Sequence, residues 1–233
     1  MLRAVLFDLD GTLLPHEIRS FMTRYLERLR AWSIETLGVD YVAPTMDCVP
    51  RLIENDGAQT NGQLLWSHVS SVIGADSAAL QENYAAFIAR HGAWLAEGIT
   101  ADPVARGVVV ACASAGKRVA LATNPLFPRC MLDARLRWGG LEPDMFGLIT
   151  SLDDSRFCKP NPEYYRQIAA DLGVAPEECL MVGNDVAMDL KPAAHTGMTT
   201  FLVNNGYHVL DASSFAPHHL GSLEGVLELL VGN

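Results

Sequence analysis

Short apolar runs that end in polar residues alternate with stretches of helical periodicity along this chain. The apolar runs predict strands at residues 2–7, 117–123, 146–150, 178–183 and 199–203. The periodic stretches predict helices at residues 103–115, 128–138, 161–172, 188–195 and 222–230. Strands that alternate with helices in this way are typical of parallel βαβ units with right-handed crossovers. The pattern therefore predicts an α/β fold built on a parallel sheet.

One long stretch after the first strand departs from this alternation. Helical spacing predicts helices at 16–37, 61–73 and 76–95, whereas residues 40–60, rich in Pro, Asp, Asn and Gly, predict a long loop. We therefore expect an all-helical cap domain at 15–98, inserted into a core domain formed by 1–14 and 99–233. We also expect Trp66 and Trp94 to pack inside the cap rather than to form a platform for substrate.

The overall charge narrows the class of partner. The chain of 233 residues has a formal net charge of −10, which argues against a nucleic-acid partner because nucleic-acid binding depends on basic residues that neutralise phosphates. No apolar run reaches the length of a membrane span, so we expect no membrane partner. The five cysteines form no C-x-x-C pair and no signal peptide precedes the first strand, so a reduced, cytoplasmic protein is expected.

Polar residues follow four of the predicted strands. Asp8 and Asp10 end the first strand, and the closely spaced carboxylates are typical of a divalent-cation site or an acid/base pair. Since ligands bind at the carboxyl ends of the strands in open α/β sheets, we expect these groups to meet there. The other members of this set are Thr123, Asn124, Lys159, Asn184, Asp185 and Asp189. Taken singly, each has an ordinary explanation as a helix cap or a surface charge.

Four motifs in order resemble those of the haloacid dehalogenase superfamily over nearly the whole chain. The first is Asp8-Leu9-Asp10-Gly11-Thr12, and the second is Thr123 at a strand end. The third is the lysine of Cys158-Lys159-Pro160, and the fourth is the acidic pair of Gly183-Asn184-Asp185-Val186-Ala187-Met188-Asp189. The resemblance implies a Rossmann-like α/β core with a helical cap.

The resemblance also implies roles for these residues. Asp8 would attack phosphorus to form an aspartyl-phosphate, and Asp10 would protonate the leaving oxygen and later activate water. Thr123, Asn124 and Lys159 would bind the phosphoryl group. The remaining groups would serve a Mg²⁺ ion: Asp8, the main-chain carbonyl of Asp10 and Asp185 as ligands, with Asn184 as the alternative to Asp185, and Asp189 orienting Lys159.

Three functions remain open on the sequence. The first is a Mg²⁺-dependent phosphomonoester hydrolase of a small soluble phosphorylated metabolite, and the second is a phosphomutase of the β-phosphoglucomutase type. A receiver-like phospho-acceptor domain is disfavoured by the long helical insertion. Family members that cleave carbon–halogen bonds lack the second aspartate, and residues 15–98 contain no lysine for phosphonate cleavage. The oligomeric state is left open.

The cap offers candidate substrate contacts. His16, Arg19 and Arg24 could touch an anionic substrate, although each is also compatible with a solvated helix face. Outside the cap, His218 and His219 lie in a predicted loop, with no third ligand in view for a metal. Cys158 precedes Lys159, and a neighbouring cation lowers a thiol pKa, but a bystander thiol is the favoured interpretation.

Overall fold

A parallel six-stranded sheet forms the centre of the computed structural model, which describes residues 1–16, 18–207 and 215–231. The strand order is β3-β2-β1-β4-β5-β6, with every neighbouring pair parallel. The strands are β1 (Ala4–Phe7), β2 (Arg118–Leu121), β3 (Leu148–Ile149), β4 (Cys179–Gly183), β5 (Thr199–Val203) and β6 (His219–Gly221). The prediction of an α/β fold on a parallel sheet is confirmed. The predicted domain ranges include residues 17, 208–214 and 232–233, which lie outside the described part.

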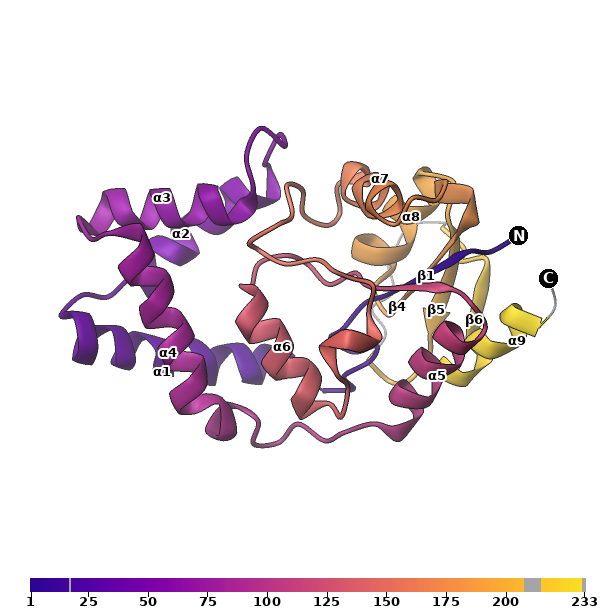
Figure 1. Cartoon of the computed structure of the whole chain (residues 1–233), viewed down its shortest axis with the longest axis horizontal. Helices are drawn as coiled ribbons and strands as arrows, with labels where there is room; N and C mark the ends of the chain where they lie inside the picture. Colours follow the sequence, from indigo (N-terminus) through magenta and orange to yellow (C-terminus); the bar gives the residue numbers. More distant parts are fainter. Residues whose placement is uncertain (17, 208–214, 232–233) are drawn as a thin grey trace.

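Helices cover both faces of this sheet (Figure 1). They are α5 (Pro103–Ser114), α6 (Arg129–Trp138), α7 (Pro162–Asp171), α8 (Lys191–His195) and α9 (Val226–Val231). Side chains alternate along β1, so Val5 and Phe7 join the apolar cluster under α5 and α9, while Ala4 and Leu6 join the cluster under α7 and α8. Burial on both faces explains why β1 and β4 at the centre of the sheet are apolar without interruption.

Four further helices lie beside the sheet, on the left in Figure 1, between β1 and α5. They are α1 (Ile18–Leu37), α2 (Val42–Ile53), α3 (Asn61–Ile73) and α4 (Ser77–Leu95). A separate hydrophobic cluster, with Tyr25, Phe87 and Trp66 among its members, joins them to one another. The same cluster takes in Met131 of α6, so the helices also pack against the sheet domain. The division into core and cap at residues 15 and 98 stays our proposal.

The expectation of a loop over residues 40–60 is wrong for most of its length, because α2 occupies Val42–Ile53. Pro44 lies in the first turn, where its missing N–H costs nothing, and Pro50 lies inside the helix. Val42, Cys48 and Leu52 are buried on one face. Burial of this face outweighs the local cost of Pro50, which sequence propensity alone does not capture.

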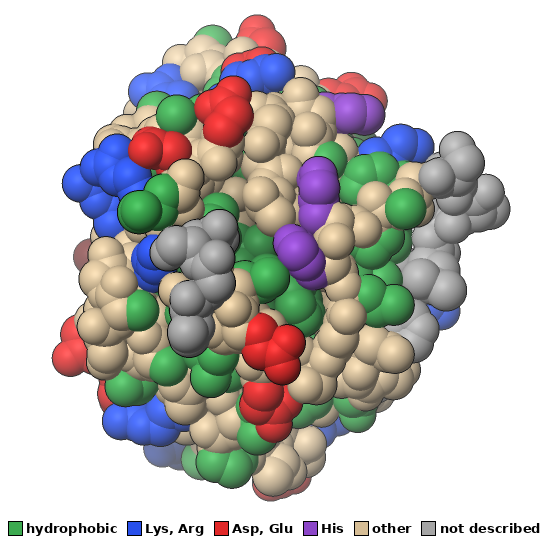
Figure 2. Space-filling view, turned by 90° about the vertical axis from the view of Figure 1, so that its right-hand side faces the viewer, with side chains coloured by type: hydrophobic (Ala, Val, Ile, Leu, Met, Phe, Trp, Pro, Cys, Tyr) green, Lys and Arg blue, Asp and Glu red, His purple; other side chains and the backbone are tan. Residues whose placement is uncertain are grey.

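The predicted loop around His218 and His219 is also wrong in part, because His219 begins strand β6 at the edge of the sheet. His219 stacks on Phe201 of β5, and the His218 ring hydrogen-bonds Thr200. Figure 2 shows the face of the molecule at this side, where hydrophobic and histidine side chains lie among acidic and basic ones. These two histidines therefore serve strand packing.

Two smaller boundaries also differ from expectation. The stretch predicted as one helix over 188–195 begins earlier, with a π-helical turn at Val186–Leu190 that leads into α8. The C-terminal helix starts as a 3₁₀ turn at Leu223–Gly225 before α9. Within the described residues, no helix combines the length and apolar character that crossing a bilayer requires.

Candidate active site

Asp8, Lys159 and Asp189 form a buried chain of charges at the carboxyl ends of β1 and β4. The Lys159 ammonium donates to Asp8 Oδ1 at 2.7 Å and to Asp189 Oδ1 at 2.6 Å. Asp8 follows β1 directly, and Lys159 precedes the N-terminus of α7. The topology thus brings together residues that are 151 positions apart in sequence. This is the juxtaposition expected from the motifs.

The two carboxylates in this buried group share a single ammonium ion. Burial raises the pKa of Asp8 to about 7, against the lowering effect of Lys159 and with further raising effects from Asp189 and Asp10. Burial by itself would lower the pKa of Lys159, but Asp189 and Asp8 hold it well above its usual value. Lys159 therefore stays protonated between the two carboxylates. A further cation nearby would stabilise the ionised form of Asp8.

Asp10 lies in contact with a residue that the sequence reasoning missed. Arg135 of α6 donates from Nη2 to Asp10 Oδ1, and His16 Nε2 lies 3.3 Å from the same oxygen. The Arg135 side chain is fully buried, and its guanidinium carbon lies 5.1 Å from the Phe21 ring centre and 5.4 Å from that of Phe127. A sign of this role was available, because Arg135 occupies a position on the apolar face of α6.

Asn184 and Asp185 of the fourth motif make different kinds of hydrogen bond. Asn184 accepts a hydrogen bond from the Thr12 hydroxyl at 3.3 Å and donates to the Tyr207 carbonyl at 2.7 Å. Asp185 instead caps the following turn, where its Oδ1 accepts from the Ala187 and Met188 amides. Burial raises the pKa of the Asp185 carboxyl, with the Met188 amide acting against it and Asp189 adding to it.

Two glycines allow this close packing. Gly11 has φ +79°, and a Cβ there would lie 2.3 Å from Asn184 Nδ2. A Cβ on Gly183 would lie 2.4 Å from Asp189 Oδ2, the oxygen that accepts from the Asp185 amide. Side chains at either position would displace the polar groups, so the motif spacing depends on glycine here.

The loop after β2 supplies Thr123 and Asn124. Thr123 is buried, and its carbonyl accepts hydrogen bonds from Tyr164 at 2.7 Å and from Thr150 at 2.8 Å. The Asn124 side chain accepts from the Lys159 amide at 3.3 Å, so it holds the loop that carries the lysine. Tyr164 had not been expected from the sequence, and its hydroxyl fixes the Thr123 backbone by donating to the carbonyl.

A cavity of about 300 Å³ opens at Asp10, Thr123 and Asn124. Helices α1 and α2 line it from one side, and the loop after β2 lines it from the other. Three of the expected site residues therefore face one enclosed volume, between the helical layer and the sheet.

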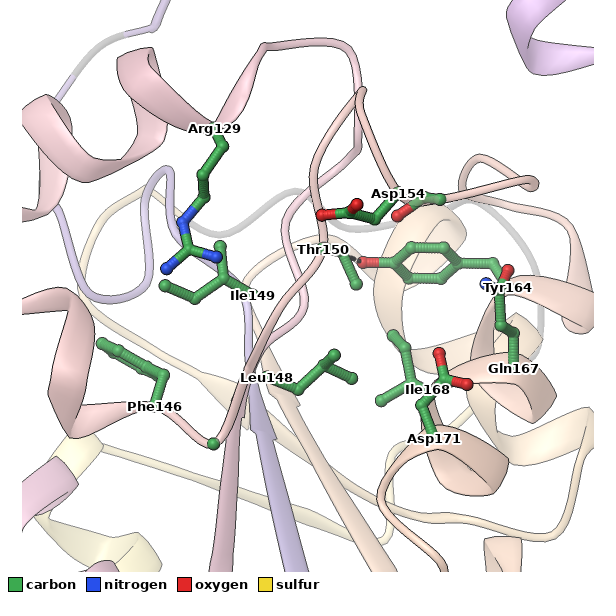
Figure 3. Close-up of a pocket in the computed structure, with 12 residues that line it drawn as sticks. Arg129, Phe146, Leu148, Ile149, Thr150, Asp154, Tyr164, Gln167, Ile168 and Asp171 are labelled. Carbon is green, nitrogen blue, oxygen red and sulfur yellow. Dashed lines mark hydrogen bonds between the residues drawn. The ribbon is translucent and has the colours of Figure 1, made fainter. Parts of the chain in front are cut away.

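A second pocket, of about 260 Å³, lies elsewhere, on the edge strand β3 between α6 and α7 (Figure 3). Arg129, Asp154 and Asp171 line it together with apolar side chains from β3. Thr150 and Tyr164, which hydrogen-bond each other, also line it. None of the expected site residues is among the described residues that line it. Of the expected site residues, Asp10, Thr123 and Asn124 line the first cavity.

The donor set suits a hard divalent cation. One carboxylate oxygen of Asp8 and one of Asp185 accept no hydrogen bond from the described residues. Only two cations, Lys159 and Arg135, lie among the described carboxylates here. These carboxylates are Asp8, Asp10, Asp185 and Asp189. Within the described residues no three acidic, histidine or cysteine side chains already converge as a metal cluster. Mg²⁺ commonly completes its shell with water, main-chain carbonyls and substrate phosphate, so two carboxylates fit it.

The other candidate residues take structural positions. Arg24 donates to the carbonyls of Trp94 and Glu97 and lies over the Trp94 ring, and Arg19 is exposed on α1. Trp66 is buried in the cluster of the cap helices, as expected. Burial raises the pKa of the Cys158 thiol to about 12, so the interpretation of this residue as a bystander agrees with the structure.

Comparison with known proteins shows the family of this chain. The family model of haloacid dehalogenase-like hydrolases matches residues 2–197. The chain is 29% identical to phosphoglycolate phosphatase of Rhodospirillum rubrum over 89% of this chain and 81% of that one. It is 28% identical to protein CbbY of Cereibacter sphaeroides, over 89% of this chain and 86% of that one.

Solved structures share the fold. A 2-haloacid dehalogenase from Pseudomonas syringae pv. Tomato aligns over 99% of both chains with a TM-score of 0.67 and 20% identity. A HAD phosphatase from Thermococcus onnurineus aligns over 100% of this chain and 99% of that one, with a TM-score of 0.62 and 21% identity. Motifs, sheet order and family match lead to one conclusion: this chain belongs to the haloacid dehalogenase-like hydrolase family.

Proposed function

We propose that this hydrolase is a Mg²⁺-dependent phosphomonoesterase that acts on a small phosphorylated metabolite through an aspartyl-phosphate on Asp8. The observation that carries the proposal is the buried chain Asp8–Lys159–Asp189, with Asp10 beside it at the carboxyl ends of the strands. The relationship to a phosphoglycolate phosphatase and to other phosphatases by name supports phosphate esters as substrates.

Asp8 is the proposed nucleophile. One of its oxygens is held by Lys159, and the other accepts no hydrogen bond from the described residues. Attack by a carboxylate oxygen of Asp8 on phosphorus forms the acyl phosphate, and cleavage of the ester P–O bond releases the alcohol. The fixed ammonium keeps the carboxylate oriented, and Asp189 on the far side of Lys159 holds the ammonium in place.

Charge on the transferred phosphoryl group needs donors that are already in position. Lys159 supplies a cation, and Thr123 with the amides of its loop supplies hydrogen-bond donors. Asn124 contributes indirectly, because it anchors the Lys159 backbone. When bound, Mg²⁺ would neutralise phosphoryl charge, held by Asp8, the Asp10 carbonyl and Asp185.

Asp10 is the proposed acid and base. It lines the same cavity as Thr123, where the leaving oxygen of a substrate would lie. Its proton would go to that oxygen, and the resulting carboxylate would then take a proton from the water that attacks the acyl phosphate. Arg135 holds the carboxylate at this position by donating to its Oδ1.

Several structural neighbours are haloacid dehalogenases, but at these identities the likeness concerns the fold. Asp10 favours phosphate chemistry, because displacement of a halide from carbon leaves no alkoxide to protonate. A phosphomutase differs from a phosphatase only in whether water or a second hydroxyl takes the phosphoryl group. The phosphatase is preferred because relatives of this chain are named phosphoglycolate phosphatase and glyceraldehyde 3-phosphate phosphatase.

A phosphate-release assay over a panel of small phosphorylated metabolites tests the proposal. We expect turnover with Mg²⁺, loss of turnover with excess EDTA, and loss of at least about a thousandfold in Asp8→Asn, which is nearly isosteric. Phosphate release at the wild-type rate by Asp8→Asn, or full activity in EDTA, would contradict it. Transfer to a second substrate hydroxyl without phosphate release would replace the phosphatase by the mutase.

A further inference from the structure

The cavity at Asp10 and Thr123 has walls of hydrocarbon. Ile18, Met22 and Leu26 of α1 stand four residues apart and so form one stripe along the helix. Val42, Met46 and Val49 of α2 form a second stripe, and Leu126 and Phe127 complete the enclosure from the core side. Asp10, Thr123 and Asn124 supply the polar groups where the proposed phosphoryl chemistry takes place. Two hydroxyl residues also line the helical side, but the Thr45 hydroxyl donates to the Tyr41 carbonyl and the Tyr25 hydroxyl bonds that of Tyr84.

The cations near the site do not reach this cavity. Among the described residues that line it, none is a lysine, an arginine or a histidine. Arg135 lies behind the Phe127 ring, fully buried, and its Nη2 is used by Asp10. Arg24 is directed to the C-terminal end of α4, and His16 lines a different pocket.

These walls discriminate between classes of alcohol. A leaving group with a carboxylate would face Asp10 with no counter-charge, and burying an unpaired charge is costly. A sugar would bury hydroxyl groups against Met and Val side chains, with few partners for them. An apolar group would instead gain from removal of its surface from water.

We propose that the alcohol released by this enzyme is uncharged and largely apolar, of the size of a short alkyl chain or a single aromatic ring. The inference rests on the proposed phosphomonoesterase function and adds the class of substrate to it. It separates this chain from its phosphoglycolate phosphatase relative, because the alcohol in phosphoglycolate bears a carboxylate. The cavity of about 300 Å³ is at the small end of ligand sites, which sets the size limit.

A series of alkyl phosphates from methyl to hexyl measures this directly. We expect kcat/KM to rise by roughly fourfold for each added methylene until the cavity is full. Phosphoglycolate and glucose 6-phosphate should both be poorer substrates than the hexyl ester. A flat series, or preference for either polar ester, would overturn the inference and leave the phosphatase function standing.

Two lysine substitutions on one helix provide a matched pair. Met46 lines the cavity and is 42% exposed, and Ile53 lies outside it on the same helix and is 39% exposed. Met46→Lys should lower kcat/KM for hexyl phosphate by at least about fourfold, the value of one methylene, and raise it for phosphoglycolate. Ile53→Lys should change neither. Equal effects of the two variants would contradict a role for the cavity wall.

Binding provides a readout that does not need turnover. Alkylphosphonates carry carbon in place of the ester oxygen, so they bind without being hydrolysed as esters. Their dissociation constants, measured by calorimetry with Mg²⁺, should fall with chain length in the wild type and less steeply in Met46→Lys. Affinity that does not depend on chain length overturns the inference. Failure of every ester to release phosphate, with this binding trend intact, would contradict the proposed function instead.

Discussion

Arg135 and Asp10 form an ion pair in which the arginine side chain is fully buried and the aspartate side chain is 23% exposed. The guanidinium lies between the rings of Phe21 and Phe127, and its Nε and Nη1 have no hydrogen-bond partner among the described residues. Asp10 is therefore the main counter-charge for a cation that water does not reach. The residue proposed as acid and base also stabilises the contact between α6 and the first motif.

A double-mutant cycle tests this pairing. Asp10→Asn should lower the free energy of unfolding by about 3 kcal/mol, because it leaves the buried arginine without its counter-charge. In the Arg135→Met background the same change should cost clearly less, with a coupling of roughly 1 to 3 kcal/mol in urea unfolding.

The exposed pair of Arg3 and Glu178, 3.0 Å apart, is the control for this cycle. Its coupling should stay below about 1 kcal/mol. Coupling of the Arg135 pair that is no larger than that of this control would contradict the structural role of Asp10.

Asp10→Asn should also change the enzyme's dependence on the leaving group. An alkyl phosphate releases a strongly basic alkoxide, so we expect a loss of roughly a hundredfold or more with such esters. p-Nitrophenolate leaves with little help, so the loss with p-nitrophenyl phosphate should be much smaller. Steady-state kinetics on both esters measure this difference, with the variant's fold checked by its unfolding curve. Equal losses would mean that Asp10 is not the acid.

Asp185 and Asn184 should differ in their effect on Mg²⁺ dependence. Asp185→Ala removes a proposed ligand and should lower activity at limiting Mg²⁺ by at least about a hundredfold, with part of the loss recovered at high Mg²⁺. Asn184→Ala removes hydrogen bonds to Thr12 and Tyr207 and should cost less than about tenfold. Titration of activity with Mg²⁺ compares the two. The opposite ranking would assign the ligand position to Asn184.

The raised pKa of Asp8 predicts a pH-dependent stability in the absence of metal. A carboxyl with a pKa of about 7 in the folded protein and 3.8 in the unfolded chain keeps its proton to higher pH when folded. Its stabilising contribution is full below about pH 4 and is lost as pH rises towards 7. Asp8→Asn cannot ionise, so it should match the wild type near pH 4 and exceed it at pH 8 by up to about 4 kcal/mol, the value of about three pKa units.

Urea unfolding in EDTA at the two pH values measures this difference. Added Mg²⁺ should stabilise the wild type at pH 8 more than it stabilises Asp8→Asn, because Asp8 is a proposed ligand. A gain in Asp8→Asn that is the same at pH 4 and pH 8 would mean that the Asp8 carboxyl is not desolvated as described.

Most strands of the sheet and the polar residues at its edge were predictable from the sequence, because a short stretch of residues is enough to recognise each of them. Continuous apolar runs mark the buried strands, and Asp8 and Lys159 sit directly at element ends where a motif can be recognised. Helix α2 left a weaker signal, since Pro50 and the surrounding polar residues favour a loop locally. Its helical state depends on packing against α3, a separate helix that begins only at Asn61, beyond the local sequence of α2.

Arg135 and Tyr164 show why part of the site was not predictable. Each lies on an ordinary helix, and each acts on a motif residue from which it is distant in sequence: Arg135 on Asp10, and Tyr164 on the Thr123 carbonyl. Only the fold brings them together. A charged side chain on the apolar face of α6 was a usable warning, whereas a tyrosine on an apolar face is too common to point to a site.

The measurement that tests the central claim most directly is identification of the phosphorylated residue. Asp10→Asn, incubated with Mg²⁺ and p-nitrophenyl phosphate and quenched in acid, should accumulate an acyl phosphate because water activation is lost while the good leaving group still departs. Peptide mass spectrometry should place the phosphate on Asp8, and Asp8→Asn in the same background should carry none. Label on another residue, or substrate turnover by the wild type with no covalent phosphate on Asp8 at any quench time, would contradict the aspartyl-phosphate mechanism.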